Sequence, residues 1–186
     1  MKVTDLPLEG LKLMQPKVFV DGRGFFLESF RVDTLRAAGV VVDFVQDNHS
    51  RSSRNTVRGL HFQKASERSP GQAKLVRVAT GQILDVAVDI RPKSPTFGRW
   101  HAEVLDDQNH AQLFVPIGFA HGFCVLSEVA DVIYKVSSYY DAAAETGFAF
   151  DDPEVGVRWP VDRAGALLSG RDISAKSFRE IVRSPT

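Results

Sequence analysis

Alternation of apolar and polar residues is the dominant pattern along the chain, and it is clearest over residues 82–90. Leu84, Val86, Val88 and Ile90 share one face, whereas Ile83 and Ala87 share the other with Asp85 and Asp89. A period of two residues is typical of a β-strand. Residues 74–80 predict a second strand, and Gly81 supplies a tight connection between the two.

Further short strands recur between turns that are rich in Gly, Pro and Asp. They are predicted over residues 18–20, 25–30, 44–49, 57–63, 100–105, 112–115 and 131–140, with one more directly after Gly122. Helices are predicted only over 32–38, ended by a left-handed Gly39, and over 174–182. Many short strands with few helices predict an all-β fold, a jelly-roll β-sandwich or barrel with a few short peripheral helices. The length favours one domain over residues 1–186.

Composition removes several classes of partner. The 23 basic and 23 acidic residues balance, so nothing favours nucleic acid or an anionic membrane, and an anionic ligand needs a local cluster of cations. Cys124 is the single cysteine and lies in an apolar run, which excludes an intrachain disulfide and indicates a buried thiol. With no signal-peptide pattern and no apolar stretch of membrane-spanning length, we expect a cytoplasmic protein.

The predicted strand 57–63 holds the first candidate for chemistry. Imidazole titrates near neutral pH, so His61, close to Arg58, is a candidate general base or metal ligand. A hydrogen-bonded structural histidine is the alternative, and for one histidine alone it is the simpler interpretation. Strict alternation places Arg58 and His61 on opposite faces of the strand, and a β-bulge at Gly59 would bring them together.

Other side chains with similar potential occur later in the chain. His121 is flanked by Ala120 and Gly122, and regular alternation over 131–140 puts Tyr134 and Tyr140 on one face. Each tyrosine is either a core residue with a satisfied hydroxyl or a proton donor or stacking surface. The spacing does not match metal-binding cupins, which carry His-x-His and a nearby Glu. We therefore predict a histidine that transfers protons without a metal ligand set.

Several long motifs in the same order resemble one family. They are Phe44-Val45-Gln46-Asp47-Asn48-His49-Ser50, Arg58-Gly59-Leu60-His61-Phe62-Gln63, Lys74-Leu75-Val76-Arg77-Val78, Asp85-Val86-Ala87-Val88-Asp89-Ile90, Ser94-Pro95-Thr96-Phe97-Gly98, Phe119-Ala120-His121-Gly122-Phe123, and Tyr134-Lys135 with Tyr139-Tyr140. These residues resemble the dTDP-4-dehydrorhamnose 3,5-epimerases, and the likeness extends over roughly residues 16 to 172. The resemblance implies a cupin-like jelly-roll isomerase without a cofactor.

The resemblance also implies a reaction. The family converts dTDP-4-keto-6-deoxy-D-glucose to dTDP-4-keto-L-rhamnose, on the route to dTDP-L-rhamnose, by inverting C3 and C5 through an enolate. Carried over, His61 is the base paired with Asp172, Tyr134 is the acid, and Lys74 stabilises the enolate oxygen. The implied substrate-binding residues are Arg23, Glu28, Gln46, Asn48, Arg58, Lys74, His121, Tyr140, Glu145 and Arg171, with Tyr140 against thymine.

The resemblance further implies a homodimer in which the amino-terminal strand serves the neighbouring site. Two departures from the family pattern stand out: Phe62 replaces a frequent tyrosine, and Gly170-Arg171 replaces a frequent Glu-Lys before Asp172. Three alternatives stay open, namely a single-site epimerase of antibiotic-sugar synthesis, a metal-dependent cupin oxygenase or isomerase, and a non-catalytic sugar-nucleotide binding module. The sequence leaves open which polysaccharide or natural product receives the sugar.

Overall fold

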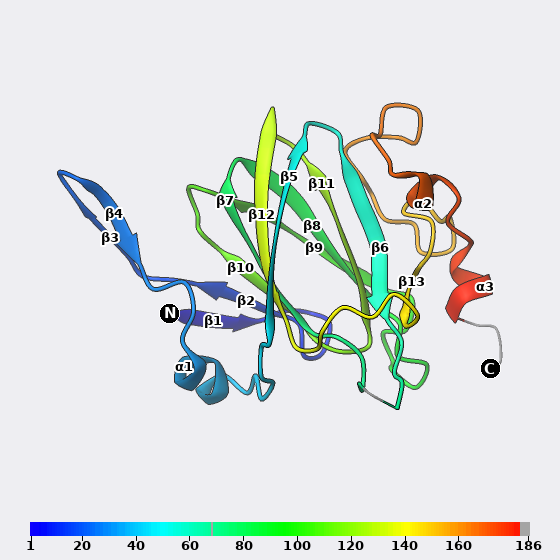
Figure 1. The fold of residues 1–186 in the computed structure, drawn as a ribbon, viewed down its shortest axis with the longest axis horizontal. Coiled ribbons are helices and arrows are strands. Elements are labelled where there is room, and N and C mark those ends of the chain that lie inside the picture. The colour runs from blue at the N-terminus through cyan, green and yellow to red at the C-terminus, as the bar shows by residue number, and fades with distance from the viewer. Residues whose placement is uncertain (68, 183–186) are drawn as a thin grey trace.

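Two antiparallel sheets packed face to face form the body of the protein (Figure 1). The computed structural model describes residues 1–67 and 69–182. The six-stranded sheet has the order β1 (Lys2–Asp5), β2 (Lys12–Gln15), β10 (Gln112–Val115), β7 (Lys74–Thr80), β12 (Val129–Val136), β5 (Gln46–Ser53). The five-stranded sheet has the order β13 (Glu145–Gly147), β6 (Val57–Gln63), β11 (Phe119–Val125), β8 (Gln82–Asp89), β9 (Trp100–Asp106).

The connections between the sheets define a jelly roll. From β5 to β8 each strand crosses to the other sheet, so hydrogen-bonded neighbours are far apart in sequence, as where β12 lies between β5 and β7. Gly81, with φ +81°, makes the tight crossing from β7 to β8. The predicted fold class is thereby confirmed.

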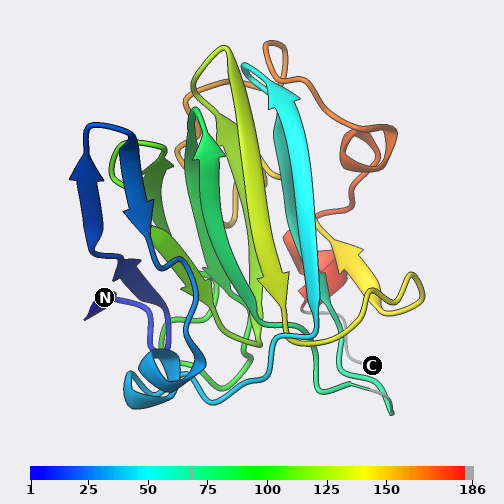
Figure 2. The same ribbon diagram turned by 60° about the vertical axis from the view of Figure 1, so that its left-hand side comes forward.

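Alternation along β8 buries both of its faces. Ile83 and Ala87 belong to the core between the two sheets. Val86 and Val88 face the other way, into a second cluster that includes Phe148 and Phe178 of the carboxyl-terminal third. The carboxyl-terminal segment therefore covers the outer face of the five-stranded sheet, opposite to the amino-terminal elements in the molecule (Figure 2).

The amino-terminal region contains a hairpin that stands away from both sheets (Figure 1). It consists of β3 (Val18–Asp21) and β4 (Gly24–Leu27), and its apolar side chains are exposed: Phe19 by 51%, Val20 by 79%, Phe25 by 60% and Phe26 by 70%. The hairpin leads to α1 (Val32–Ala37), which ends before a left-handed Gly39 as predicted.

Four predicted elements are wrong in extent. The strand predicted over 25–30 ends at Leu27, and the strand predicted over 44–49 is β5, Gln46–Ser53. The strand predicted over 131–140 is β12, which begins at Val129 and ends at Val136. Tyr140 therefore lies in a loop. The helix predicted over 174–182 is reduced to α3 (Phe178–Val182), and a separate turn of helix, α2 (Gly170–Ile173), precedes it.

The structure explains why these helices begin where they do. Ser177 accepts a hydrogen bond from the backbone N–H of Glu180, and the Glu180 carboxylate accepts one from the backbone N–H of Ser177. This reciprocal arrangement is a capping box, which fixes the start of α3. Ser169 caps α2 by accepting a hydrogen bond from the backbone N–H of Asp172.

Candidate active site

A cavity of about 520 Å³ lies between the two sheets, next to the carboxyl-terminal segment. Its walls come from β5, β7 and β12 of the six-stranded sheet, from β6, β11 and β13 of the five-stranded sheet, and from α2 with the loop that leads into it. The lining residues are Ser50, Thr56, Val57, Arg58, His61, Lys74, His121, Phe123, Tyr134, Glu145, Leu167, Leu168, Ser169, Arg171 and Asp172. The cavity brings together eight predicted site residues, among them all four assigned to proton transfer: His61, Tyr134, Asp172 and Lys74.

His61 and Asp172 form a close pair although they are 111 residues apart. Nε2 of His61 lies 2.6 Å from Oδ1 of Asp172, and Ser169 donates its hydroxyl to Oδ2 at 2.8 Å. Burial alone would raise the pKa of Asp172, but the hydrogen bonds from His61 and Ser169 outweigh it and lower that pKa. An ionised carboxylate only accepts, so Nε2 carries the proton and Nδ1 is the basic nitrogen.

A β-bulge places Arg58 and His61 in the same cavity. Across the pairing of β11 with β6, His121 is opposite His61 and Phe123 is opposite Arg58, so β6 holds one extra residue. Gly59 fits this bulge because it has φ +144° and because a Cβ there would lie 2.6 Å from Cα of Gly122. The predicted bulge is confirmed, and strict alternation fails at this point.

Tyr134 approaches the cavity from the other sheet. It lies on β12, directly opposite Asn48 of β5, and packs partly against the core. Burial and the nearby charge of Glu145 raise the pKa of its hydroxyl, so the phenol keeps its proton at neutral pH. A base on one sheet and an acid on the other therefore face a single space.

Lys74 is the first residue of β7 and lines the same cavity. Burial lowers the pKa of its ammonium group to about 8, and the negative charges of Glu145 and Asp85 limit the decrease. Glu145 itself forms an ion pair with Arg171, with Oε2 and Nη1 separated by 2.7 Å. Lys74 is thus charged at neutral pH but close to losing its proton.

A second histidine-carboxylate pair lies beside the first. His121 is opposite His61 on the neighbouring strand, and its Nε2 lies 2.7 Å from Oδ1 of Asp85. Asp85 has no exposed surface and His121 is 6% exposed. Burial lowers the pKa of His121, so the ring is neutral with its proton on the nitrogen that faces Asp85.

Three further predicted residues lie beside the cavity rather than in its walls. Gln46 donates a hydrogen bond to Oδ1 of Asn48 at 2.8 Å and accepts one from the backbone N–H of Tyr140 at 3.1 Å. The hydroxyl of Tyr140 is hydrogen-bonded to Glu145, which raises the pKa of the phenol. These contacts connect an exposed tyrosine to a residue that lines the cavity.

Arg23 and Glu28 are not brought into this cavity. Arg23 is at the tip of the β3–β4 hairpin and pairs with Asp21 at 2.6 Å, and Glu28 follows β4 and pairs with Arg31 at 3.5 Å. Within the described part of the chain, both residues belong to the exposed hairpin and its continuation.

Sequence reasoning missed several residues that contribute to the site. Ser169 orients Asp172, and Leu167, Leu168 and Phe123 supply an apolar wall. Ser52 accepts a hydrogen bond from Nε of Arg58 at 3.1 Å. The Ser169-x-x-Asp172 spacing was a usable signal, because a serine three residues before an acidic residue is typical of a helix start. The apolar wall gave no comparable signal.

The donor set does not resemble a metal centre. Among residues 1–67 and 69–182 no group of three or more His, Cys, Asp or Glu side chains has the arrangement to hold a metal ion. No helix in the same residues is long and apolar enough to cross a membrane.

Fold and site together define a class: a cupin-like jelly-roll protein whose cavity presents a carboxylate-paired histidine and a tyrosine from opposite sheets. Residues 5–180 match the family described as dTDP-4-dehydrorhamnose 3,5-epimerase, and the chain belongs to this family. It is 45% identical over 184 residues to the dTDP-4-dehydrorhamnose 3,5-epimerase of Neisseria gonorrhoeae, an alignment that covers 99% of this chain and 55% of that relative.

Solved structures that are similar to this chain are also named as epimerases. One is the dTDP-6-deoxy-D-glucose-3,5-epimerase from Legionella pneumophila Philadelphia 1 in complex with dTDP-4-keto-L-rhamnose, with 42% identity, a TM-score of 0.91, and coverage of 97% of this chain and 94% of that one. Another is a 3'-monoepimerase from Streptomyces bikiniensis in complex with dTDP-quinovose, with 36% identity, a TM-score of 0.85, and coverage of 92% and 85%. Both double and single epimerases therefore share this fold.

Proposed function

We propose that this protein is an isomerase that converts dTDP-4-keto-6-deoxy-D-glucose to dTDP-4-keto-L-rhamnose, the epimerisation of C3 and C5 in dTDP-L-rhamnose biosynthesis. Membership of the epimerase family supports the activity, and the relative solved with dTDP-4-keto-L-rhamnose supports a dTDP-sugar as substrate. The observation that carries the proposal is the position of His61 and Tyr134 on opposite walls of one cavity.

The proposed mechanism moves one proton at a time. Nδ1 of His61 removes the proton from the carbon beside the C4 carbonyl, and the electron pair of that C–H bond moves into an enolate. Asp172, 2.6 Å behind the ring, stabilises the imidazolium that forms. Tyr134 then delivers its proton to the opposite face of the same carbon, which inverts the centre. Exchange with solvent then removes the extra proton from His61 and returns a proton to Tyr134 before the second carbon reacts. Both C3 and C5 adjoin the same carbonyl, so one pair of groups serves both.

Lys74 is proposed to stabilise the enolate oxygen. A fixed ammonium in a cavity that is partly closed to water interacts with a developing negative charge more strongly than it would in bulk water. Its pKa of about 8 means that this stabilisation is present below pH 8 and decreases above it. The chemistry needs no redox cofactor, because only protons move between the side chains and the substrate.

Substrate binding is proposed for the charged and polar residues around the cavity. Arg58 and Arg171 offer planar guanidinium groups that suit the diphosphate. His121, whose Nε2–H is directed to Asp85, offers Nδ1 as an acceptor for a sugar hydroxyl. Gln46, Asn48 and Glu145 complete the polar surface, and Tyr140, 59% exposed, offers a face on which thymine can stack.

We further propose a homodimer in which the β3–β4 hairpin serves the partner's site. Its exposed Phe19, Phe25 and Phe26 form an apolar surface whose exposure to water is energetically unfavourable. Exchange of the hairpin between subunits would bring Arg23 and Glu28 to a second cavity. Sedimentation of wild type as a monomer at micromolar concentration would contradict this arrangement.

We also propose that the protein is located in the cytoplasm. The composition supports this location, because Cys124 is buried and has no cysteine partner.

Solvent exchange tests the proposed function. In heavy water the wild-type protein should introduce deuterium at both C3 and C5 of dTDP-4-keto-6-deoxy-D-glucose, and His61→Ala should introduce none at either carbon. His101→Ala is the matched control. His101 lies in the same cross-strand row as His61 and His121, on β9, and also pairs with a carboxylate, yet it does not line the cavity. This control should exchange at the wild-type rate.

The number of exchanged positions separates the remaining alternatives. Deuterium at one carbon only would identify a single-site epimerase, the activity of the Streptomyces bikiniensis relative. Tight binding of the nucleotide without any exchange would identify a binding module. Full exchange by His61→Ala would remove His61 from the mechanism.

A further inference from the structure

Asp85 is the most deeply buried charged group next to the cavity, and the proposed mechanism leaves it without a role. It lies on β8 behind His121 and has no exposed surface. Oδ1 accepts the hydrogen bond of His121, but Oδ2 has no hydrogen-bond partner among the described residues. An ionised carboxylate that is buried with one oxygen unpaired costs several kcal/mol of desolvation unless a nearby charge compensates for it. Such a group requires an explanation.

The compensating charge available to Asp85 is Lys74. The two residues come from opposite sheets, and an electrostatic attraction between them favours the charged form of Lys74. The charged and titratable side chains that line the cavity with Lys74 come from β6, β11, β12, β13 and α2; they are Arg58, His61, His121, Tyr134, Glu145, Arg171 and Asp172. Each carboxylate in this set already has a partner of its own.

Glu145 and Asp85 are the two carboxylates that favour the charged form of Lys74, and they differ in screening. Glu145 is paired with Arg171, and its side chain keeps 19% of its surface exposed, so solvent and a guanidinium weaken its field. The only hydrogen-bond partner of the Asp85 carboxylate among the described residues is a neutral histidine. A charge in a low-dielectric interior acts on its neighbours with less screening than one in contact with water.

We propose that Asp85 is a positioning residue for the epimerisation, which fixes His121 with its Nε2–H toward Asp85 and holds Lys74 as the ammonium ion through its negative charge. The first effect keeps Nδ1 of His121 available as an acceptor for the substrate. The second keeps a cation at the place where the enolate oxygen forms. The inference rests on the role of Lys74 in the proposed function, but its physical content is testable without the reaction.

Asp85→Asn tests the charge while keeping an oxygen that can accept from His121. We expect the pKa of Lys74 to fall by about one unit, from about 8 in the wild type. It is measured by NMR titration of protein labelled with ¹³C at the lysine Cε, with Lys74→Arg for assignment. The high-pH limb of kcat/KM should move by the same amount. The activity relative to wild type should then be about fourfold lower at pH 8 than at pH 6.5.

Asp89→Asn is the matched control. Asp89 is on the same strand and the same face as Asp85 and is equally buried, but it does not face the cavity. This variant should lose stability and leave both the Lys74 titration and the pH profile unchanged. Asp85→Glu, which restores the charge, should restore the pKa of Lys74 toward the wild-type value.

An unchanged Lys74 titration in folded Asp85→Asn would overturn the inference and leave Asp85 a purely structural residue. Should Asp85→Asn not fold, the ¹⁵N chemical shifts of His121 in the wild type provide the test. A ring that is charged at pH 7, or that carries its proton on Nδ1 alone, would contradict the proposed Nε2–H tautomer. A shifted Lys74 in a protein without epimerase activity would refute the proposed function and with it the role of Asp85 in epimerisation, while the effect of the Asp85 charge on Lys74 would stand.

Discussion

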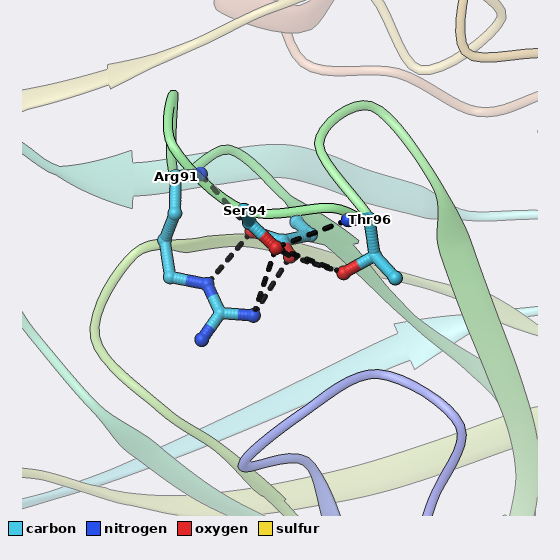
Figure 3. Close-up of polar contacts among 4 residues, drawn as sticks. Arg91, Ser94 and Thr96 are labelled. Atoms are coloured by element: carbon cyan, nitrogen blue, oxygen red, sulfur yellow. Dashed lines mark hydrogen bonds and ion pairs between the residues drawn. The ribbon is translucent and has the colours of Figure 1, made fainter.

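Asp85 and Asp89 lie four residues apart on the same face of β8, and neither has any exposed surface, yet their surroundings differ completely. The carboxylate of Asp89 accepts five hydrogen bonds, at 2.5 to 3.0 Å, from the loop that follows β8. Figure 3 shows Arg91, Ser94 and Thr96 directed to this one group. The carboxylate of Asp85 accepts one hydrogen bond from described residues, and the donor, His121, lines the cavity.

The difference teaches how to distinguish a structural buried charge from a functional one. The donors to Asp89 outweigh its burial and lower its pKa to about 2, so its charge is fully compensated within one loop. A compensated charge holds that loop and has little effect at a distance. The charge of Asp85 is only partly compensated, and it is therefore available to act on groups in the cavity.

The largest effect that would sharpen this comparison is expected at Asp172, a third buried carboxylate, whose partner is the proposed base. Asp172→Ala removes the group that orients His61 and stabilises its imidazolium, so kcat should fall by roughly a thousandfold, within the range of general base catalysis. Initial rates of epimerisation, measured with the folded fraction determined by circular dichroism, check this. A decrease of less than tenfold would show that the pairing with Asp172 contributes little to the chemistry.

A smaller effect, on stability instead of rate, is expected for Asp89→Ala. The variant leaves the donors of Arg91, Ser94 and Thr96 without their common acceptor in a partly buried loop, which should cost about 3 kcal/mol in the free energy of unfolding. Urea denaturation measures this cost. The kcat of the molecules that remain folded should equal that of wild type. A selective loss of kcat would contradict the proposal that Asp89 is structural and that only Asp85 acts on the cavity.

The smallest effect concerns acid stability. Because the pKa of folded Asp89 is about 2, below its value in the unfolded chain, the ionised group stabilises the native state fully above about pH 4. As the pH falls toward 2 this contribution, about 2 kcal/mol, is lost. The free energy of unfolding of the wild type should therefore decrease more steeply between pH 4 and 2 than that of Asp89→Asn. Parallel curves for the two proteins would contradict the assignment.

The sequence by itself determined most of the strands, though not the short β1, β2 and β13, and the chemistry that each motif could support. Strands 57–63, 74–80 and 112–115 have the predicted bounds, because a period of two residues is a local property of the chain. The proposed catalytic set followed from motifs that resemble the epimerase family, and the structure places those side chains around one cavity.

Only the tertiary structure decided which side chains meet. The bulge at Gly59 depends on the close approach of β11, which no local pattern records. Alternation placed Asp85 and Asp89 on one face and gave no reason to treat them differently. The jelly-roll crossings put His121 beside Asp85 and the loop of Arg91 around Asp89, because compensation of a buried charge depends on neighbours in space and not on neighbours in sequence.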